Sequence, residues 1–352
     1  MSVTIVVGGQ YGSEGKGKVA ALLGAATARP WHVRCGGPNS GHTVTLGGKE
    51  VVLRQVPASI DPANATFCLA AGCVVDEDIL ISELQLLEID RERIIIDPRA
   101  VIVTPRDRIA ERETLSHISS TYSGTGAAMM RRMSRSNDTL LAGNSDPLNR
   151  RCRVETVAPL LRRAASEGTE IIVEGSQGFG LSLLHGPNYP FVTSRDTTAS
   201  GFATEVGLSP LAIHKIIVVL RTFPIRVGGS SGPLPDEISW EAIAQLSGAP
   251  ITVPEFTSVT KRLRRVAKFD FGLAKMACQY NQPTSLALMG TDRLEYANNV
   301  ATNLSELGPI TRNLIDRLEN ETGVPVEFLG TGFRTLDAIR VASPSPLECA
   351  HV

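Results

Sequence analysis

The stretch of this sequence with the clearest chemical potential is a glycine-rich turn, residues 8–18, which reads Gly-Gly-Gln-Tyr-Gly-Ser-Glu-Gly-Lys-Gly-Lys. The apolar run Val3 to Val7 precedes it, and a helix-compatible run, Val19 to Ala28, follows it. A strand, a glycine turn and a helix in this order aim backbone N–H groups and the positive end of a helix at an anion. The match to the P-loop pattern is imperfect, because Gln10 replaces its first glycine and Gly17 its hydroxyl residue. We predict a phosphate site here; the alternative is a plain glycine-rich surface turn.

Four more polar loops stand out, at residues 36–43, 119–135, 174–200 and 257–265. Loops that follow buried strands are where α/β proteins bind their ligands. The last loop has four cations in the five positions 261–265. On a helix this charge would simply form a solvated face. Its hydroxyl-rich approach followed by arginines fits a bound carboxylate better, since the guanidinium fork matches a carboxylate.

The elements that must position these loops alternate between strand and helix. The run Ile216 to Leu220 is wholly apolar, as in a strand buried on both faces of a parallel sheet. Further strands are expected at 3–7, 32–37, 51–56, 66–71, 94–96, 101–103, 170–173, 285–289 and 326–329, and helices at 76–87, 106–117, 154–167, 240–246, 270–280 and 311–321. This order predicts an α/β fold with a mostly parallel central sheet and helices on both faces. We expect residues 1–352 to form one domain with long active-site loops, since no repeat or low-complexity linker interrupts them.

Composition narrows the classes of function. A net charge of −1 gives no reason to expect nucleic acid or an anionic membrane as a partner, and no apolar stretch is long enough for a membrane span. Most of the 35 basic residues are arginines, a bias that suits small anionic ligands. The six cysteines form no CxxC pair and lie near no histidine at metal spacing, so buried free thiols in a reducing compartment are expected. The N-terminus is a first strand and not a signal peptide, and a cytoplasmic protein is predicted.

Four motifs, taken together and in this order, resemble adenylosuccinate synthetase, the purine-pathway ligase. They are Gly-Gln-Tyr-Gly-Ser-Glu-Gly-Lys-Gly-Lys at 9–18, Gly-Gly-Pro-Asn-Ser-Gly-His-Thr at 36–43, Glu-Gly-Ser-Gln-Gly at 174–178 and Thr-Lys-Arg-Leu-Arg-Arg at 260–265. The resemblance runs from Val3 to about Arg334. It implies the P-loop-like nucleotide-binding fold of that family, transfer of a γ-phosphoryl group to O6 of a purine nucleotide, and displacement of that phosphate by the amino group of aspartate. Positive charge and Mg²⁺ are needed around the transferring phosphoryl group.

The resemblance also implies roles for individual residues. Catalysis falls to Lys16, to His42 as the general acid at O6, and to position 13, here Ser13. The donor nucleotide is implied to contact Glu14, Gly15, Lys16, Gly17, Gly41, His42, Thr43, Asp292, Gly330 and Gly332. The substrate purine nucleotide is implied to contact Ser13, Asn39, Ser120, Thr121, Arg135, Gln177 and Thr193. L-Aspartate would bind at Val259, Thr260, Arg262 and Arg264, and Mg²⁺ at Ser13 and Gly41.

A homodimer is implied as well, because the family has an arginine that reaches the nucleotide 5′-phosphate of the partner subunit. Alignment through Gly124-Thr125-Gly126 places it at Arg135, although Arg131 and Arg132 leave the register open by a few residues.

Two departures from the family pattern are informative. Ser13 stands where the family has an aspartate that takes the N1 proton and ligates Mg²⁺, and a serine cannot act as a carboxylate base. Its smaller side chain offers room and an acceptor for a 2-amino group, so the chain most resembles the bacteriophage branch of the family. Members of that branch convert dGMP and aspartate to 2-amino-2′-deoxyadenylosuccinate, a step towards diaminopurine DNA. Gly290 replaces the lysine of a Lys-x-Asp element that reads GTP, which favours ATP or dATP as donor.

Three hypotheses follow from these residues. The first is the phage-type ligase acting on dGMP in the host cytoplasm. The second is an ordinary adenylosuccinate synthetase that acts on IMP with GTP and tolerates Ser13, and the third is a catalytically silent nucleotide-binding regulator. The sequence leaves open how the N1 proton is removed without the aspartate: by Glu14, by a water held by Ser13, or before binding, in a pre-ionised substrate. It also leaves open ATP versus dATP, and ribose versus deoxyribose.

Overall fold

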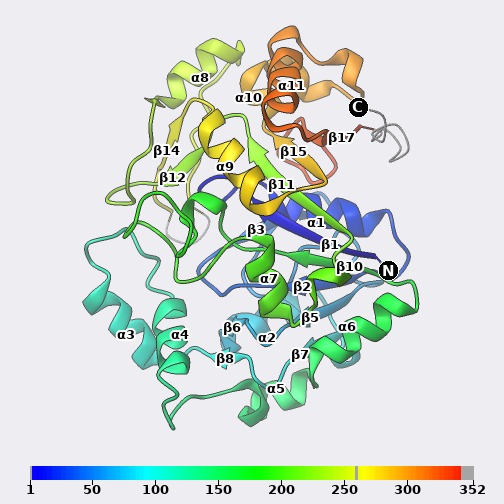
Figure 1. The fold of residues 1–352 in the computed structure, drawn as a ribbon, viewed down its shortest axis with the longest axis vertical. Coiled ribbons are helices and arrows are strands. Elements are labelled where there is room, and N and C mark those ends of the chain that lie inside the picture. Colours follow the sequence, from blue (N-terminus) through cyan, green and yellow to red (C-terminus); the bar gives the residue numbers. More distant parts are fainter. Residues whose placement is uncertain (1, 258–260, 342–352) are drawn as a thin grey trace.

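A ten-stranded sheet forms the centre of the molecule in a computed structural model, which describes residues 2–257 and 261–341 (Figure 1). From one edge to the other the strands are β17 (Ala338–Arg340), β16 (Val326–Gly330), β15 (Ser285–Met289), β11 (Lys215–Arg221), β1 (Ser2–Gly8), β10 (Glu170–Glu174), β2 (Trp31–Arg34), β5 (Thr66–Leu69), β7 (Ile94–Ile96) and β9 (Arg153–Val154). All neighbouring pairs are parallel except β16 and β17. The fold class predicted from the sequence is therefore confirmed.

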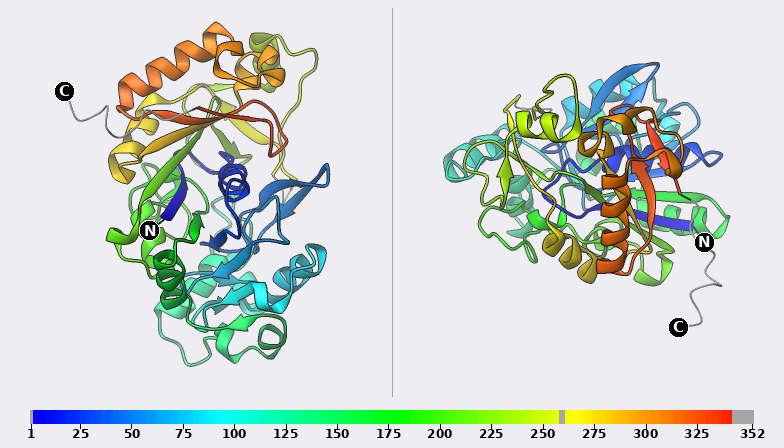
Figure 2. Two further views of the ribbon diagram at one scale, coloured as in Figure 1. Left: turned by 90° about the vertical axis from the view of Figure 1, so that its right-hand side faces the viewer. Right: turned by 90° about the horizontal axis from the view of Figure 1, so that it is seen from above.

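Successive side chains of a strand point to opposite sides of the sheet, and on the central strand β1 the side chains of both sides are buried. Val3, Ile5 and Val7 belong to one core cluster and Val6 to another, and all four are fully buried. Helix α1 (Lys16–Ala25) packs in the cluster of Val6, whereas α6 (Val157–Ser166), α7 (Ala199–Val206) and α9 (Phe271–Asn281) pack in the other. The two side views show helices on both sides of the sheet (Figure 2).

The remaining helices lie towards the two ends of the sheet (Figure 1). They are α2 (Glu77–Leu86), α3 (Pro105–Thr114), α4 (Thr125–Met133), α5 (Asp146–Arg151), α8 (Trp240–Ser247), α10 (Thr291–Leu294) and α11 (Pro309–Thr322). Helices α3 and α4 pack on each other near the β2–β9 end, and α8, α10 and α11 gather near the β15–β17 end.

Three small sheets flank the central one. An antiparallel hairpin pairs β3 (His42–Leu46) with β4 (Lys49–Leu53), and a parallel pair joins β6 (Val74–Val75) to β8 (Val101–Ile102). A three-stranded antiparallel sheet has the order β12 (Ile225–Val227), β14 (Arg264–Ala267), β13 (Glu237–Ile238). The hairpin and the three-stranded sheet carry two of the polar loops singled out in the sequence.

Several sequence predictions of local structure were wrong. Residues 119–135, expected to be one polar loop, contain helix α4, and the end of the 174–200 loop contains the start of α7. Part of the cationic run, expected to be loop or charged helix face, is strand β14. His42 and Thr43, expected in a loop, begin strand β3. Strands β14 and β3 form by pairing with β12 and β13 and with β4, respectively, whereas α7 starts at a local cap, the Thr198 side chain, which accepts from the Gly201 N–H (3.1 Å).

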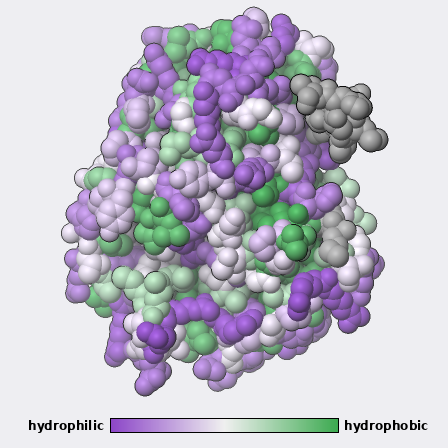
Figure 3. All heavy atoms as spheres, viewed as in Figure 1, coloured by the Kyte–Doolittle hydropathy of each residue, from purple (hydrophilic) through white to green (hydrophobic). Residues whose placement is uncertain are grey.

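The mixed surface and the buried free cysteines match what the composition predicted. Hydrophilic and hydrophobic side chains are interspersed over the face seen in Figure 3. Within the described ranges, no helix combines the length and the apolar character needed to cross a membrane. Five cysteines are free and buried, as predicted, and Cys349 lies outside the described residues. Burial raises the pKa of Cys73 to about 12, so this thiol stays protonated and unreactive.

Candidate active site

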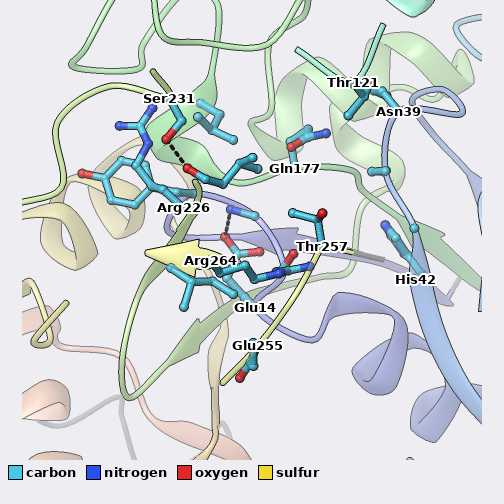
Figure 4. Close-up of a pocket in the computed structure, with 18 of the residues that line it drawn as sticks. Glu14, Asn39, His42, Thr121, Gln177, Arg226, Ser231, Glu255, Thr257 and Arg264 are labelled. Carbon is cyan, nitrogen blue, oxygen red and sulfur yellow. Dashed lines mark hydrogen bonds between the residues drawn. The ribbon is translucent and has the colours of Figure 1, made fainter. Parts of the chain in front are cut away.

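A cavity of about 670 Å³ opens where the central strands end, in the size range of small-molecule sites (Figure 4). It is lined from the turn after β1, the loops after β2, β10, β11 and β15, and the loop before β14. The sequence-predicted site residues that line it are Ser13, Glu14, Gly15, Lys16, Gly17, Asn39, Gly41, His42, Thr43, Ser120, Thr121, Gln177, Thr193, Arg262, Arg264, Asp292 and Gly332. Gly330 and Arg135 do not line it, and Val259 and Thr260 lie outside the described residues.

The glycine turn after β1 is built for an anion, and it is internally neutralised in this structure. Gly15, with φ +103°, is the N-cap of α1, so the positive end of that helix faces the turn. The buried carboxylate of Glu14 accepts hydrogen bonds from the backbone N–H groups of Gln10 (3.1 Å) and Gly12 (2.8 Å) and from Lys16 Nζ (2.6 Å). Any anion entering the turn would have to compete with Glu14 for the Lys16 ammonium.

The glycine turn also packs backbone against backbone on the loop after β10. The Gly180 N–H donates to the carbonyl of Gln10 (2.7 Å). A Cβ atom at Gly178 would lie 2.6 Å from the carbonyl oxygen of Gln10 and 2.7 Å from the nitrogen of Gly12. No side chain fits between the two loops, which explains the glycine at position 178.

Ser13 lies exposed in the cavity, in the left-handed region at φ +57°. Its carbonyl accepts a hydrogen bond from Arg221 Nη1 (3.2 Å), and its hydroxyl makes none with any described residue. The position that carries a base in the resembled family is here a small, neutral group open to the cavity.

His42 is held by a buried ionic network beneath the cavity. Its Nδ1 contacts Glu174, which also accepts from Arg34 Nη1 (3.1 Å) and from the N–H of Ala58 (2.7 Å). Arg34 Nη1 lies 2.7 Å from the same ring nitrogen, so Nδ1 donates to Glu174 in one tautomer and accepts from Arg34 in the other, and both partners hold the ring from this side. Burial, with help from the positive charges of Arg34 and Lys16, lowers the pKa of His42 well below its usual value. The neutral ring thus keeps Nε2 for a ligand.

A second lobe of the cavity, near α10, contains Asp292 and Gly332. Gly290 has φ +79° and caps α10, and the Gly330 carbonyl accepts from the Gly290 N–H (3.1 Å) and from Thr291 Oγ1 (3.1 Å). Gly330 therefore supports this lobe from behind. Burial raises the pKa of Asp292.

Lys18 and the aromatic ring of Phe333 complete this second lobe. Lys18 Nζ donates to the carbonyls of Gly332 (2.9 Å) and Asp337 (2.6 Å), and burial lowers its pKa to about 8. Phe333 is exposed, and its ring packs under the guanidinium of Arg293 at 4.8 Å. The lobe thus offers an aromatic face beside a carboxylate, an arrangement suited to a heterocyclic base.

The cationic loop divides its charges between the cavity and the outside. Arg262 and Arg264 line the cavity, whereas Arg265 turns away and pairs with Glu237. A tight turn holds this loop: the Thr257 N–H donates to the carbonyl of Arg262 (2.9 Å), and the Arg262 N–H donates to Thr257 Oγ1 (2.9 Å). Two guanidinium groups on one arm of the cavity suit a dicarboxylate ligand.

Arg135 follows the end of α4 and is exposed outside the cavity of its own chain. Its neighbours are committed elsewhere, because Arg131 pairs with Asp107 (2.8 Å) and Arg132 donates to the carbonyl of Ala71 (2.6 Å). Arg135 makes no side-chain hydrogen bond or ion pair with the residues that the structure describes.

Sequence reasoning missed several residues that shape the site. It gave no role to Arg34, Arg221 or Glu255, and it named Glu174 only as part of a motif. A usable signal existed for three of them: Arg34, Glu174 and Arg221 are charged residues at the carboxyl ends of buried strands, where parallel sheets place ligand contacts. No such signal marks Glu255.

Comparison with known proteins agrees with this geometry. The sequence model of the adenylosuccinate synthetase family matches residues 5–141 and 147–304, so the chain belongs to that family. It is a nucleotide-binding C–N ligase of purine biosynthesis. Curated adenylosuccinate synthetases of Methanocaldococcus jannaschii (37% identical over 339 residues, 94% of each chain) and Thermococcus onnurineus (36% over 335 residues, 93% of this chain and 95% of the relative) are similar to it along almost their whole length.

Two solved structures share the fold. The succinoaminodeoxyadenylate synthetase of cyanophage S-2L, bound to dGMP and to dATP as an energy donor, superposes with a TM-score of 0.80 at 28% identity, covering 99% of this chain and 97% of that one. The fully ligated adenylosuccinate synthetase of Plasmodium falciparum gives a TM-score of 0.86 at 18% identity, covering 97% and 100%. The similarity to the phage enzyme supports the resemblance to the phage branch noted in the sequence.

Proposed function

We propose that this ligase joins L-aspartate to the 6-position of dGMP and yields 2-amino-2′-deoxyadenylosuccinate. The observation that carries the proposal is Ser13, an exposed and neutral side chain whose hydroxyl has no hydrogen-bond partner among the described residues. A carboxylate next to N1 of a purine would also lie near C2, where dGMP carries an amino group and IMP only hydrogen. The hydroxyl oxygen leaves room for that amino group and can accept a hydrogen bond from it. The similarity to a phage enzyme bound to dGMP supports the same substrate.

The donor is proposed to be ATP or dATP. Gly290 has no lysine side chain that could read a guanine. Its φ of +79° is strained for any residue with a side chain, and a Cβ at this position would also lie 3.2 Å from Thr222 Oγ1. Asp292 and the exposed ring of Phe333 remain available to a base. The phage S-2L structure contains dATP as energy donor, which agrees with this assignment.

Phosphoryl transfer to O6 is assigned to the glycine turn and His42. Lys16 and the N–H groups at the start of α1 would stabilise the transferring phosphate. Glu174 fixes the ring of His42, leaving Nε2 to act at O6. The negative charge of a bound nucleotide opposes Arg34 and Lys16, which both lower the pKa of His42, so ligand binding favours the protonated ring that a general acid requires.

Mg²⁺ is proposed as the cofactor, held by Ser13 and the carbonyl of Gly41. Within the described ranges, no three His, Cys, Asp or Glu side chains gather to hold a metal ion. The sparse donor set fits Mg²⁺, which usually takes most of its ligands from substrate phosphates and water. When bound, the ion would neutralise charge on the donor phosphates.

L-Aspartate is assigned to the arm that carries Arg262 and Arg264, with Val259 and Thr260 from the sequence prediction. The two guanidinium groups can each receive one carboxylate, and the amino group is then left free to attack C6. We propose that the enzyme is a homodimer in which Arg135 reaches the nucleotide 5′-phosphate of the partner subunit. The side chain of Arg135 supports this, because it is exposed and has no ion-pair partner in the part of the chain that the structure describes, as do the internal partners of Arg131 and Arg132.

A coupled assay tests the proposal. The purified enzyme is given aspartate and Mg²⁺ with dGMP, GMP or IMP against ATP, dATP or GTP, and kcat/KM is compared across the nine pairs. A preference for dGMP with an adenine nucleotide is expected. A preference for IMP would establish the second candidate, an ordinary adenylosuccinate synthetase, which the names of the curated relatives favour. No turnover of any pair would establish a silent regulator, although the charged cavity with Lys16 and His42 argues against it.

A further inference from the structure

Arg221, at the end of β11, lies between the glycine turn that carries Ser13 and the segment of Glu255 that leads into the cationic loop. Figure 4 shows the adjoining Glu255 and Arg264. Its Nη1 donates both to the carbonyl of Ser13 (3.2 Å) and to Glu255 (3.1 Å), and its Nη2 donates to the other oxygen of Glu255 (2.5 Å). One guanidinium therefore joins the glycine turn to the segment that leads into the cationic loop.

The main chain of Arg221 is tied to the same turn. The side-chain amide of Gln10 donates to the Arg221 carbonyl (3.1 Å) and accepts from the Arg221 N–H (3.1 Å). Gln10 occupies the position where a P-loop has its first glycine. Its side-chain amide has a structural role here, because it pairs with the main chain of Arg221. Arg221 is thus fixed relative to the turn at its backbone as well as at its side chain.

Glu255 continues the connection into the cationic loop. Its backbone carbonyl accepts from the Arg264 N–H (2.9 Å), and the neighbouring residues Phe256 and Leu263 form an antiparallel bridge. Burial alone would raise the pKa of Glu255, but Arg221, Arg264 and Arg293 hold it below its usual range. The ionised carboxylate binds Arg221 by both oxygens, a geometry that fixes direction as well as distance.

Arg221 holds Ser13 through its carbonyl, whereas the Ser13 side chain makes no hydrogen bond among the described residues. We infer that Arg221 and Glu255 form a strut that couples the turn carrying Ser13 to the cationic loop, so that a dicarboxylate on the loop and a purine at Ser13 position each other. Both are positioning residues, acting through Ser13 and Arg264. The identity of the two ligands rests on the proposed function, whereas the coupling rests on the contacts above.

The test is the variant Glu255→Gln, which keeps the shape of the side chain and removes the charge that holds Arg221. The KM for aspartate and the KM for the purine nucleotide are both expected to rise, each about fivefold or more, and the ratio of dGMP to IMP turnover is expected to fall. In the double variant Glu255→Gln with Ser13→Ala, the two effects on the purine KM should be less than multiplicative, since both act on one position.

The matched control is Glu237→Gln, which removes the charge that pairs with Arg265 of β14 outside the cavity. It should leave both KM values and the selectivity as in the parent. If Glu255→Gln does not fold, as judged by its melting curve, Glu255→Asp shortens the strut and should move the same parameters in the same direction.

Two results would overturn the inference. One is a rise in the aspartate KM with the purine KM and selectivity unchanged, which means that Glu255 serves its own loop only. The other is an unchanged pair of KM values with a lower kcat or melting temperature, which means that the pair is merely structural. If the parent enzyme prefers IMP, the proposed dGMP activity fails, but the joint rise of both KM values can still be measured on IMP.

Discussion

Replacing Ser13 by aspartate tests chemistry and selectivity at one position. Aspartate adopts left-handed backbone readily, so φ +57° at this residue adds little strain to Ser13→Asp and the fold should persist. The carboxylate would occupy the space that we assign to the 2-amino group of dGMP, and it would restore the base of the family. The variant should lose activity on dGMP and gain activity on IMP.

The size of the loss follows from the polar groups that are displaced. Misplacing a purine in a site that pairs its polar groups costs about 2–4 kcal/mol. At 1.36 kcal/mol per tenfold change in rate, this corresponds to about a 30- to 900-fold fall in kcat/KM for dGMP. The measurement is kcat/KM for dGMP and IMP with parent and variant, with melting temperatures to verify folding.

Two companion variants separate the causes. Ser13→Asn has the size of aspartate without its charge, so it should also reject dGMP if room decides selectivity. Ser13→Ala keeps the room and loses the hydroxyl, so it should bind dGMP more weakly without becoming an IMP enzyme. Should Ser13→Asp process dGMP as well as the parent does, selection at this position is refuted and the selectivity lies elsewhere in the cavity.

The other predictions concern the dimer and the acid stability. Arg135→Ala should lose about 2–5 kcal/mol of phosphate interaction and be inactive; mixing it with inactive His42→Ala should restore some activity, and verified heterodimers without recovery would refute a shared site. His32 is fully buried without a hydrogen-bond partner among the described residues, and burial lowers its pKa to about 4. The unfolded chain binds this proton first, so stability falls as the pH drops from 6.5 towards 4, by about 2 kcal/mol at pH 5. Denaturant unfolding at pH 7 and pH 5 should show a smaller loss for His32→Leu; an equal loss would mean that another group titrates.

Local patterns predicted some elements of the fold well. Strand β15 has the bounds read from its apolar run, and Asp76 caps helix α2 as expected, accepting from the Ile79 N–H (3.4 Å). These elements carry their own signal, either a fully buried run or a capping residue. Helix α4 had no such signal, because its cap is supplied by the carboxylate of Glu111 on α3, which accepts from the N–H groups of Gly124 (2.8 Å) and Gly126 (2.6 Å).

The residues of the candidate site also fall into a group that local patterns predicted and a group that they did not. Residues in spaced motifs, such as Lys16 and Gln177, were predicted and do line one cavity. The residues that hold them in place were not, because the contact of Glu174 with His42 joins positions 132 residues apart, and no local pattern encodes it. The sequence thus identified the groups that face a ligand better than the groups that support them.

The backbone packing at Gly178 sets the spacing of two loops that line the cavity. The glycine turn after β1 and the loop that carries Gln177 meet through peptide groups, because the Gly180 N–H donates to the Gln10 carbonyl. Their separation is therefore set by main-chain geometry, and side-chain drift around the purine leaves it unaltered. We therefore expect a substitution at position 13 to change both the base that fits and the chemistry available there, while the spacing of the two loops stays as the main chain sets it.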